Sequence, residues 1–332
     1  MSVFSAFLVE KEDKNVTHSI VERSTDDLPD GDLLIKVQYS SVNYKDALSA
    51  KGMPGVTRNY PHTPGIDAAG VVVESKVPEF AEGDEVIVIG FDLGMNTAGG
   101  YGEFIRVPAS WATSLPVGMT TRETMVIGTA GFTAALCIEK LERMGATPAD
   151  GPVIVTGATG GVGSVAVALL AQSGYEVIAS SGKPDKHDYL KSLGANSVIG
   201  REELIEANPR PMLGESYAHG VDTVGGEILS NVIKSLSYGG SVAICGLVAS
   251  TAFSTTVLPF ILRGVNVLGI DSVVLPIEQK NKTWNRLATD WKLNTLDEMT
   301  VEIGLEGISE SVDTIFAGQA SGRTLVVHGQ QD

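Results

Sequence analysis

A glycine-rich turn near the middle of the chain constrains the fold more than any other feature. An apolar run of strand character, Pro152–Thr156, precedes the turn and an apolar helix start, Val165–Leu170, follows it, while Gly157, Gly160 and Gly163 stand between them at intervals of three. Glycine lets the backbone turn sharply, lets a phosphate approach main-chain N–H groups at a helix N-terminus, and lets the helix pack closely on the strand. The commoner spacing is G-x-G-x-x-G, and a tight turn without a ligand is the alternative. The strand before and the helix after favour a dinucleotide-binding turn.

Apolar strand-like runs alternate with helix-like segments beyond this turn. The expected strands are 175–180, 194–199, 220–226 and 239–246, and the expected helices are 186–193 and 228–236. Such alternation predicts a doubly wound parallel sheet with helices on both faces. A ligand site should then lie outside the carboxyl ends of its strands.

The end of the second strand bears on the choice of cofactor. NAD-selective folds of this kind carry an Asp or Glu there, which accepts hydrogen bonds from the ribose hydroxyls. This chain has Ser181-Gly182-Lys183 and no carboxylate. Because a hydroxyl and an ammonium can both hold a 2′-phosphate, we expect NADPH as the cofactor, the alternative being a polar turn with a solvated lysine.

Charge and composition exclude several classes of function. The 332 residues carry a formal net charge of −16, so we expect neither nucleic acid nor a membrane surface as a partner. The N-terminus lacks the basic segment of a secretory signal and no apolar stretch is long enough to span a membrane, so we expect a cytoplasmic protein. Two cysteines, Cys137 and Cys245, indicate buried packing residues and no disulfide framework.

The N-terminal third has a different pattern of predicted secondary structure. Short apolar strands at 32–40, 69–74 and 84–90 are separated by Gly and Pro turns, which predicts a compact, mostly β domain. The chain ends in another strand-like run, 324–328, which we expect to return to that domain. We therefore predict one domain from residues 1–125 and 259–332, and a nucleotide-binding domain from residues 126–258.

Several short motifs are spread over the chain. Besides the glycine turn they are SSVNYKDAL at 40–48, PGID at 64–67, GTAGFTA at 128–134, YLKSLGA at 189–195, PFILRG at 259–264 and GRTLV at 322–326. With them, essentially the whole chain resembles the medium-chain dehydrogenase/reductase superfamily, in particular its zinc-free YhdH/AcuI branch of quinone oxidoreductase-like and acryloyl-CoA reductases. The resemblance implies a GroES-like, mostly β catalytic domain joined to a Rossmann domain. Lys183 stands where the branch usually has arginine, and Ala68 where it usually has phenylalanine.

The resemblance also implies which residues bind NADPH. They are Tyr44, Thr159, Gly160, Gly161, Val162, Ser181, Gly182, Lys183, Arg201, Leu247, Ile261, Ser272 and Gln319. From the residues alone, the preferred interpretation of Arg201 is an ordinary helix-start residue paired with Glu202 or Glu203. A homodimer is expected through the apolar segment 257–270, whose alternative is a strand buried within one subunit.

The residues needed for a zinc site are missing. Asn43 stands where the metal-binding branch of the superfamily begins its motif with cysteine, and Gly65-Ile66-Asp67 stands where that branch has Gly-His-Glu. None of the five histidines forms a metal-like pair with another ligand. We therefore predict no bound metal, and a substrate polarised by hydrogen bonds.

A metal-free nicotinamide site suits the reduction of the conjugated double bond of a short enoyl thioester, acryloyl-CoA to propanoyl-CoA, the acyl-CoA substrate that we expect. A hydride reaches the β-carbon and a proton the α-carbon. Tyr44 is the first candidate for orienting the substrate or donating the proton. Asn43 is a candidate donor to the developing oxyanion, and Asp67 a candidate for holding Asn43 or Lys45. The alternatives are that Asn43 caps a helix, Tyr44 stacks on the nicotinamide, and Asp67 closes a turn.

Two other classes of function compete with an enoyl thioester reductase. One is an NADPH:quinone reductase, which has little need for a positioned acid. The other is a non-enzymatic NADPH-binding module. Turnover of acryloyl-CoA and of a quinone separates all three.

Overall fold

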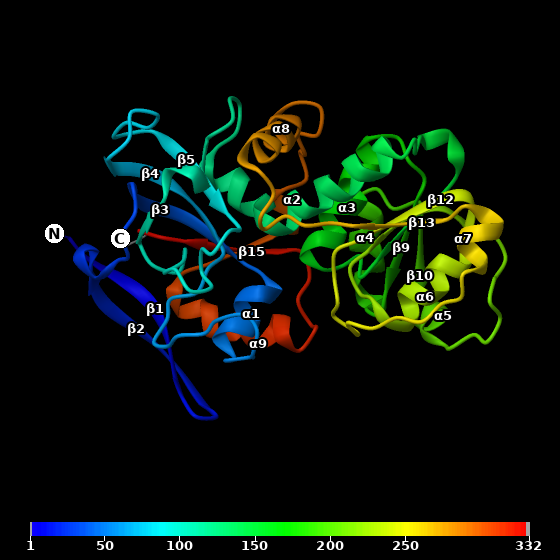
Figure 1. Ribbon diagram of the computed structural model, residues 1–332, viewed down its shortest axis with the longest axis horizontal. Coiled ribbons are helices and arrows are strands. Elements are labelled where there is room, and N and C mark those ends of the chain that lie inside the picture. The colour runs from blue at the N-terminus through cyan, green and yellow to red at the C-terminus, as the bar shows by residue number, and fades with distance from the viewer. Residues whose placement is uncertain (1, 330–332) are drawn as a thin grey trace. The chain divides into compact units, whose positions relative to one another are not determined.

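The computed structural model describes residues 2–329, which divide into two compact units (Figure 1). The β unit comprises the chain through Thr129, Val273–Asp290 and the residues from Leu296 onward. The α/β unit comprises Ala130–Ser272 and Trp291–Thr295. Helix α2 (Thr121–Arg143) contributes to both units and breaks at Gly128, whose backbone is not helical.

The α/β unit is built on a six-stranded parallel sheet that lies between helices (Figure 1). The strand order is β10-β9-β8-β11-β12-β13. The strands are β8 (Val153–Thr156), β9 (Val177–Ser181), β10 (Ser197–Gly200), β11 (Tyr217–Asp222), β12 (Leu236–Ile244) and β13 (Asn266–Gly269). The helices are α3 (Gly161–Gln172), α4 (His187–Ser192), α5 (Glu202–Ile205), α6 (Gly226–Ser235) and α7 (Leu258–Arg263). The predicted doubly wound parallel sheet is confirmed.

The β unit combines a hairpin with a larger, mixed sheet. The hairpin strands are β1 (Val3–Glu12) and β2 (Asn15–Ser24). The seven-stranded sheet runs β14-β15-β3-β4-β5-β7, with β6 paired to β3. Its strands are β3 (Leu33–Val42), β4 (Asp67–Ser75), β5 (Glu85–Ile89), β6 (Phe104–Val107), β7 (Ala112–Ser114), β14 (Thr300–Ile303) and β15 (Arg323–Val327), and the helices of the unit are α1 (Tyr44–Ala50), α8 (Ile277–Ala288) and α9 (Ile308–Phe316). Alternate residues of β3 to β6, such as Leu33, Ile35, Val72 and Ile105, form its core because side chains alternate across a strand.

Short 3₁₀ helices link several of these elements. They are Thr25–Asp27, Ala109–Trp111, Pro148–Asp150, Pro184–Lys186, Asp297–Met299 and Leu305–Gly307.

The unit boundaries differ from the predicted domains. The α/β unit continues to Ser272, beyond the predicted end at residue 258, because β13 pairs in parallel with β12 and completes the sheet. The first boundary falls after Thr129 and not after residue 125, next to the break in α2. The terminal strand β15 pairs with β3, so the chain does return to the β unit as expected.

Helix α2 is also the one helix among the described residues that is long and apolar enough to cross a membrane. Within its most apolar window 89% of the residues are buried inside the protein. Burial of this kind is typical of a core helix.

The two cysteines, distant in sequence, interact within the α/β unit. Cys137 on α2 is fully buried, and Cys245, directly after β12, is half-buried. Both thiols are free. The hydrogen bond with the Cys245 thiol, together with burial, raises the pKa of the Cys137 thiol well above its ordinary value, as for an unreactive packing residue.

Candidate active site

The predicted residue Asn43 lies between β3 and α1, at the N-cap of the helix. Its backbone is extended, and its N–H donates to the Asp46 carboxylate over 2.9 Å. Asparagine is a favoured residue at this position. Tyr44 is the first residue of α1 and is half-buried. The helix-capping alternative for Asn43 is therefore present in the structure.

The second predicted residue, Asp67, is fully buried at the start of β4 and collects four hydrogen bonds. Its Oδ2 accepts from Ser41 Oγ, from Asn43 Nδ2 over 2.8 Å and from the Thr129 N–H over 2.8 Å. Its Oδ1 accepts from the Thr129 hydroxyl. Asp67 thus holds Asn43, one of the two partners that the sequence suggested for it, and it joins β3, α1 and α2 at one carboxylate.

The carboxamide of Asn43 is fully engaged. Nδ2 donates to Asp67 over 2.8 Å and to the Oδ2 of Asp46 over 3.2 Å, while Oδ1 accepts from Arg323 over 3.3 Å. An amide nitrogen has only two protons to donate. The geometry therefore favours a positioning role for Asn43 over the expected role as donor to an oxyanion.

Two further charged residues complete this network, and sequence reasoning did not single them out. Arg323, at the start of β15, is only 2% exposed. Burial lowers the pKa of its guanidinium, and the charges of Asp67 and Asp46 oppose that shift. Asp46 is fully buried, and its Oδ1 accepts the N–H groups of Gly65 and Ile66 over 3.1 and 2.9 Å. Burial first, and then the charge of Asp67, raises the pKa of Asp46 to about 7.

Gly128, at the break in α2, lies against the hydrogen-bonded network of Asp67, Arg323 and Ser41. Its φ is +51°, and a Cβ there would lie 2.5 Å from Asp67 Oδ2 and 2.6 Å from both Arg323 Nη2 and Ser41 Oγ. Only glycine fits this space and this backbone conformation. The break directs the N–H and the hydroxyl of Thr129 to Asp67.

The glycine turn of the α/β unit has the form expected of a dinucleotide-binding turn. Gly157 has a φ of +60°, Gly160 is the N-cap of α3, and a Cβ on Gly163 would lie 2.3 Å from the Gly157 carbonyl oxygen. The first N–H groups of α3 have no acceptor within the helix, so Gly161 and Val162 can present theirs to a phosphate. The residues present therefore fit the pyrophosphate of a dinucleotide.

The end of β9 brings together the residues expected at a 2′-phosphate. Ser181 Oγ accepts the Lys183 N–H over 3.1 Å, and the Ser181 carbonyl accepts the Arg201 N–H over 3.1 Å. The Arg201 guanidinium covers Gly182, where a Cβ would lie 2.9 Å from its Nε. Burial lowers the pKa of Lys183.

The alternative for Arg201, an ion pair with Glu202 or Glu203, is not seen. Glu203 instead accepts the Gly200 N–H over 3.1 Å. Across residues 2–329, no carboxylate lies within ion-pair distance of the Arg201 side chain. The guanidinium is therefore available to an anion.

The other predicted cofactor contacts are distributed over both units. Thr159 is buried beside the glycine turn, Leu247 and Ile261 are 49% and 68% exposed, and Ser272 accepts a hydrogen bond from Thr133 over 2.9 Å, all within the α/β unit. Gln319 follows α9 in the β unit and donates its N–H to the Thr314 carbonyl. Contact of these residues and of Tyr44 with a nucleotide stays a prediction.

Within the described part of the chain, no three His, Cys, Asp or Glu side chains are arranged to hold a metal ion. His62 is buried and His328 is half-buried, and they bond through Nε2 to the carbonyls of Gly94 and Gly100 over 2.9 and 2.7 Å. Burial lowers the pKa of both imidazoles. These two histidines hold the loop that precedes Tyr101.

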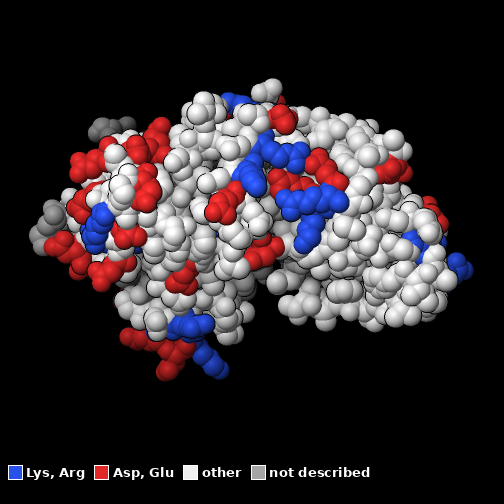
Figure 2. Space-filling model, turned by 45° about the horizontal axis from the view of Figure 1, so that its top comes forward, with Lys and Arg blue, Asp and Glu red and all other residues white. Residues whose placement is uncertain are grey.

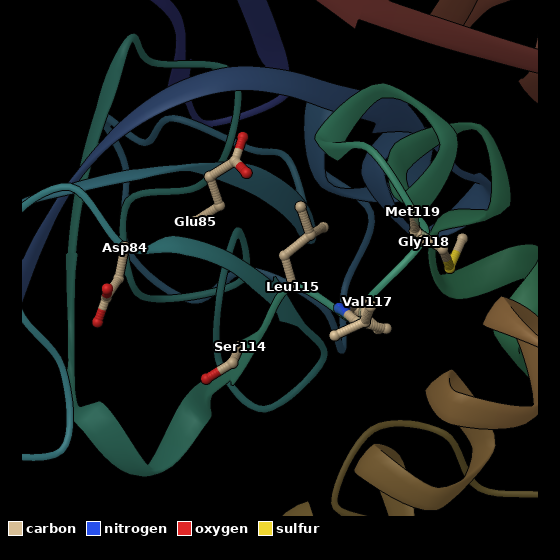
Figure 3. Close-up of a pocket in the computed structure, with 8 residues that line it drawn as sticks. Asp84, Glu85, Ser114, Leu115, Val117, Gly118 and Met119 are labelled. Carbon is tan, nitrogen blue, oxygen red and sulfur yellow. The ribbon is translucent and has the colours of Figure 1, made fainter.

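One hollow of the β unit lies apart from the predicted site residues. A shallow hollow in the β unit is lined by Asp84, Glu85 and the segment 114–119 (Figure 3), and none of the predicted site residues contributes to it. On the face shown in Figure 2, acidic and basic side chains lie interspersed.

Comparison with known proteins identifies the class to which this fold and site belong. A family model described as an alcohol dehydrogenase GroES-like domain matches residues 29–117, and one described as a zinc-binding dehydrogenase matches residues 161–289. The protein is thus an oxidoreductase of the alcohol dehydrogenase type, with a GroES-like domain in the β unit and a Rossmann-like parallel sheet in the α/β unit.

Three similar proteins identify the branch of the family to which the chain belongs. The probable acrylyl-CoA reductase AcuI of Escherichia coli K12 is 44% identical over 321 residues, which cover 97% of this chain and 98% of that protein. The putative quinone oxidoreductase YhfP of Bacillus subtilis is 44% identical over 98% of this chain and 99% of its own, and its crystal structure with NAD bound has a TM-score of 0.95. The crystal structure of the YhdH oxidoreductase of Salmonella enterica in complex with NADP has a TM-score of 0.95 and 44% identity, and the match covers 98% of this chain and 100% of that one. The chain belongs to the YhdH/AcuI branch of the medium-chain dehydrogenase/reductase superfamily.

Proposed function

We propose that the protein catalyses the NADPH-dependent reduction of the conjugated double bond of a short enoyl thioester, acryloyl-CoA to propanoyl-CoA. The observation that carries the proposal is the hydrogen-bonded network of Asp67, Asn43 and Arg323, which holds the N-cap of the helix that Tyr44 begins. The name of the 44% identical AcuI supports the choice of an enoyl thioester.

NADPH and the enoyl thioester would be bound by different sets of residues. When bound, NADPH supplies the hydride that reaches the β-carbon of the substrate. The glycine turn and the group Ser181, Lys183 and Arg201 would hold its pyrophosphate and its 2′-phosphate. In the β unit, Tyr44 would orient the enoyl thioester and give a proton to its α-carbon.

Asn43 and Asp67 would act on Tyr44 and not on the substrate. Asn43 caps the helix that Tyr44 begins, and Asp67 holds the Asn43 carboxamide. The backbone that carries Tyr44 would thereby be kept in place, which matters because a misplacement of about 1 Å can cost about a hundredfold in rate.

We further propose a cytoplasmic homodimer. Within residues 2–329, strand β13 pairs with β12 alone and forms an edge of its sheet. Beside it Val257, Ile261 and Leu262 are 65%, 68% and 58% exposed. An unpaired strand edge with exposed apolar side chains is suited to association with a second copy.

A comparison of acceptors tests the proposed function. Purified protein is assayed with NADPH and acryloyl-CoA, a simple quinone, or no acceptor, and we expect kcat/KM for acryloyl-CoA to exceed that for the quinone by at least about a hundredfold, since contacts to the CoA moiety add binding energy at the transition state. Equal or faster turnover of the quinone would move the function to a quinone reductase, the activity in the name of YhfP. NADPH binding without turnover of either acceptor would indicate a non-enzymatic NADPH-binding module.

A further inference from the structure

Arg323 has surroundings that are unusual for a charged side chain. It is 2% exposed, whereas arginine is almost never fully buried without strong partners. It opens β15, whose next residue pairs with Val42 at the end of β3. The strand register therefore puts the guanidinium beside the residues that follow β3.

The guanidinium bonds to three residues in two segments, both far from Arg323 in sequence. Nε donates to the Val126 carbonyl over 2.7 Å, Nη1 to Asn43 Oδ1 over 3.3 Å and Nη2 to Ser41 Oγ over 2.9 Å. None of these acceptors is a carboxylate. A rigid, planar fork of donors can serve three such acceptors at once, which an ammonium on a flexible stem does not reproduce.

Each of these bonds leads to Asp67. The Ser41 hydroxyl accepts a hydrogen bond from Arg323 and donates one to Asp67. Because Asn43 Oδ1 can only accept, its bond from Arg323 fixes the orientation of the carboxamide, so that Nδ2 faces Asp67. Val126 lies two residues before the break at Gly128, beyond which Thr129 donates twice to Asp67.

We infer that Arg323 is a positioning residue for the reaction: it orients the Asn43 carboxamide and thereby fixes the start of α1 that presents Tyr44. The inference rests on the proposed function, because the rate that Arg323 influences is that of the proposed reaction. The geometric part, the orientation of Asn43 by Arg323, can be tested without turnover.

The kinetic test is a double-mutant cycle between Arg323 and Asn43. We expect Arg323→Lys to lower kcat at least about tenfold while KM for NADPH stays within about twofold, because the nucleotide-binding residues of the α/β unit are not in this network. In an Asn43→Ala background the same substitution should lower kcat by less than about twofold, since residues that act as one unit are not additive. Additive losses would contradict the inference. Arg106→Lys, at an arginine of the same unit that pairs with Glu74 on the surface, is the matched control and should leave kcat unchanged.

The second measurement needs no substrate. In protein labelled with ¹⁵N-asparagine, the side-chain amide of Asn43 is identified by its loss in Asn43→Ala. We expect Arg323→Lys to shift this resonance and to speed its hydrogen exchange at least about tenfold, and Arg106→Lys to do neither. Should Arg323→Lys fail to fold, Arg323→Gln serves in its place. An unchanged Asn43 amide would overturn the inference even if acryloyl-CoA is reduced, and a shifted amide in a protein that reduces no acceptor would overturn only the proposed function.

Discussion

The Asn43 carboxamide donates to the Asp67 carboxylate over 2.8 Å, and this one contact joins the N-cap of α1 to the first residue of β4. The metal-binding branch of the superfamily, which the chain resembles in other motifs, has cysteine at the first of these places and the glutamate of Gly-His-Glu at the second. Here Asn43 and Asp67 bond to one another. Their polar groups are thereby engaged at the start of the helix that Tyr44 begins.

Removal of the Tyr44 hydroxyl tests whether this residue is the proton donor. We expect Tyr44→Phe to lower kcat at least about a hundredfold, within the range of general acids, with little change in KM for NADPH. Tyr39→Phe, on β3 of the same unit, is the control. A loss of less than tenfold would restrict Tyr44 to orienting the substrate.

Cofactor preference should depend on Lys183 and Arg201. A charge-assisted hydrogen bond contributes about 1.5–3 kcal/mol, so Lys183→Ala and Arg201→Ala should each weaken NADPH binding roughly ten- to a hundredfold and leave NADH nearly unchanged. Fluorescence titration with both nucleotides measures this. Lys186→Ala, at a neighbouring lysine that lies near Asp185, is the control. If neither substitution changes the ratio of the two Kd values, the 2′-phosphate binds elsewhere.

Metal content provides a separate test of the site. Because Asn43 and Asp67 are engaged with one another and with Arg323, we expect purified protein to hold no stoichiometric zinc and to keep its activity in strong chelator. Elemental analysis and an assay before and after dialysis against chelator measure both. One tightly bound zinc per chain, with activity lost on its removal, would contradict the account.

Asp46 should make stability depend on pH in an unusual direction. Its pKa is raised from an ordinary 3.8 to about 7, so between these values the folded protein binds more protons than the unfolded chain. The contribution of Asp46 to stability therefore falls as the pH rises from about 4 through about 7. We expect the free energy of unfolding of the wild type, relative to Asp46→Asn, to drop by roughly 2–3 kcal/mol from pH 5 to pH 8.

Urea unfolding at several pH values measures this difference. Asp30→Asn, at an exposed aspartate, is the matched control and should follow the wild type at each pH. A difference between wild type and Asp46→Asn that is constant with pH would show that Asp46 stays ionised in the folded protein.

Local sequence patterns predicted much of this structure. Contacts between segments that are distant in sequence could not be predicted from such patterns. The spacing of apolar residues and of glycines was enough to predict the α/β sheet. The motif containing Asn43 and Tyr44 pointed to residues that the structure brings together with Asp67. Arg323 and Asp46 were missed as site residues because their roles arise from strand pairing and burial. Arg323 lies in the motif GRTLV and Asp46 in the motif SSVNYKDAL, both of which carried the family resemblance. Membership of these motifs was the sequence signal that could have identified the two residues.

The predicted domain boundary after residue 258 differs from the unit boundary after Ser272 for a related reason. The run 257–270 is apolar throughout, and nothing in it distinguishes a strand that completes the sheet from one that returns to the β unit. Only the pairing of β13 with β12 decides this.

Product analysis with deuterated cofactor tests the central claim most directly. Acryloyl-CoA is incubated with the protein and NADPH that carries deuterium at C4 in the transferred position, and the thioester product is examined by mass spectrometry and NMR. The account predicts one propanoyl-CoA for each NADPH oxidised, with a single deuterium at the β-carbon and a proton from solvent at the α-carbon. Absence of propanoyl-CoA, or deuterium at the α-carbon, would contradict it.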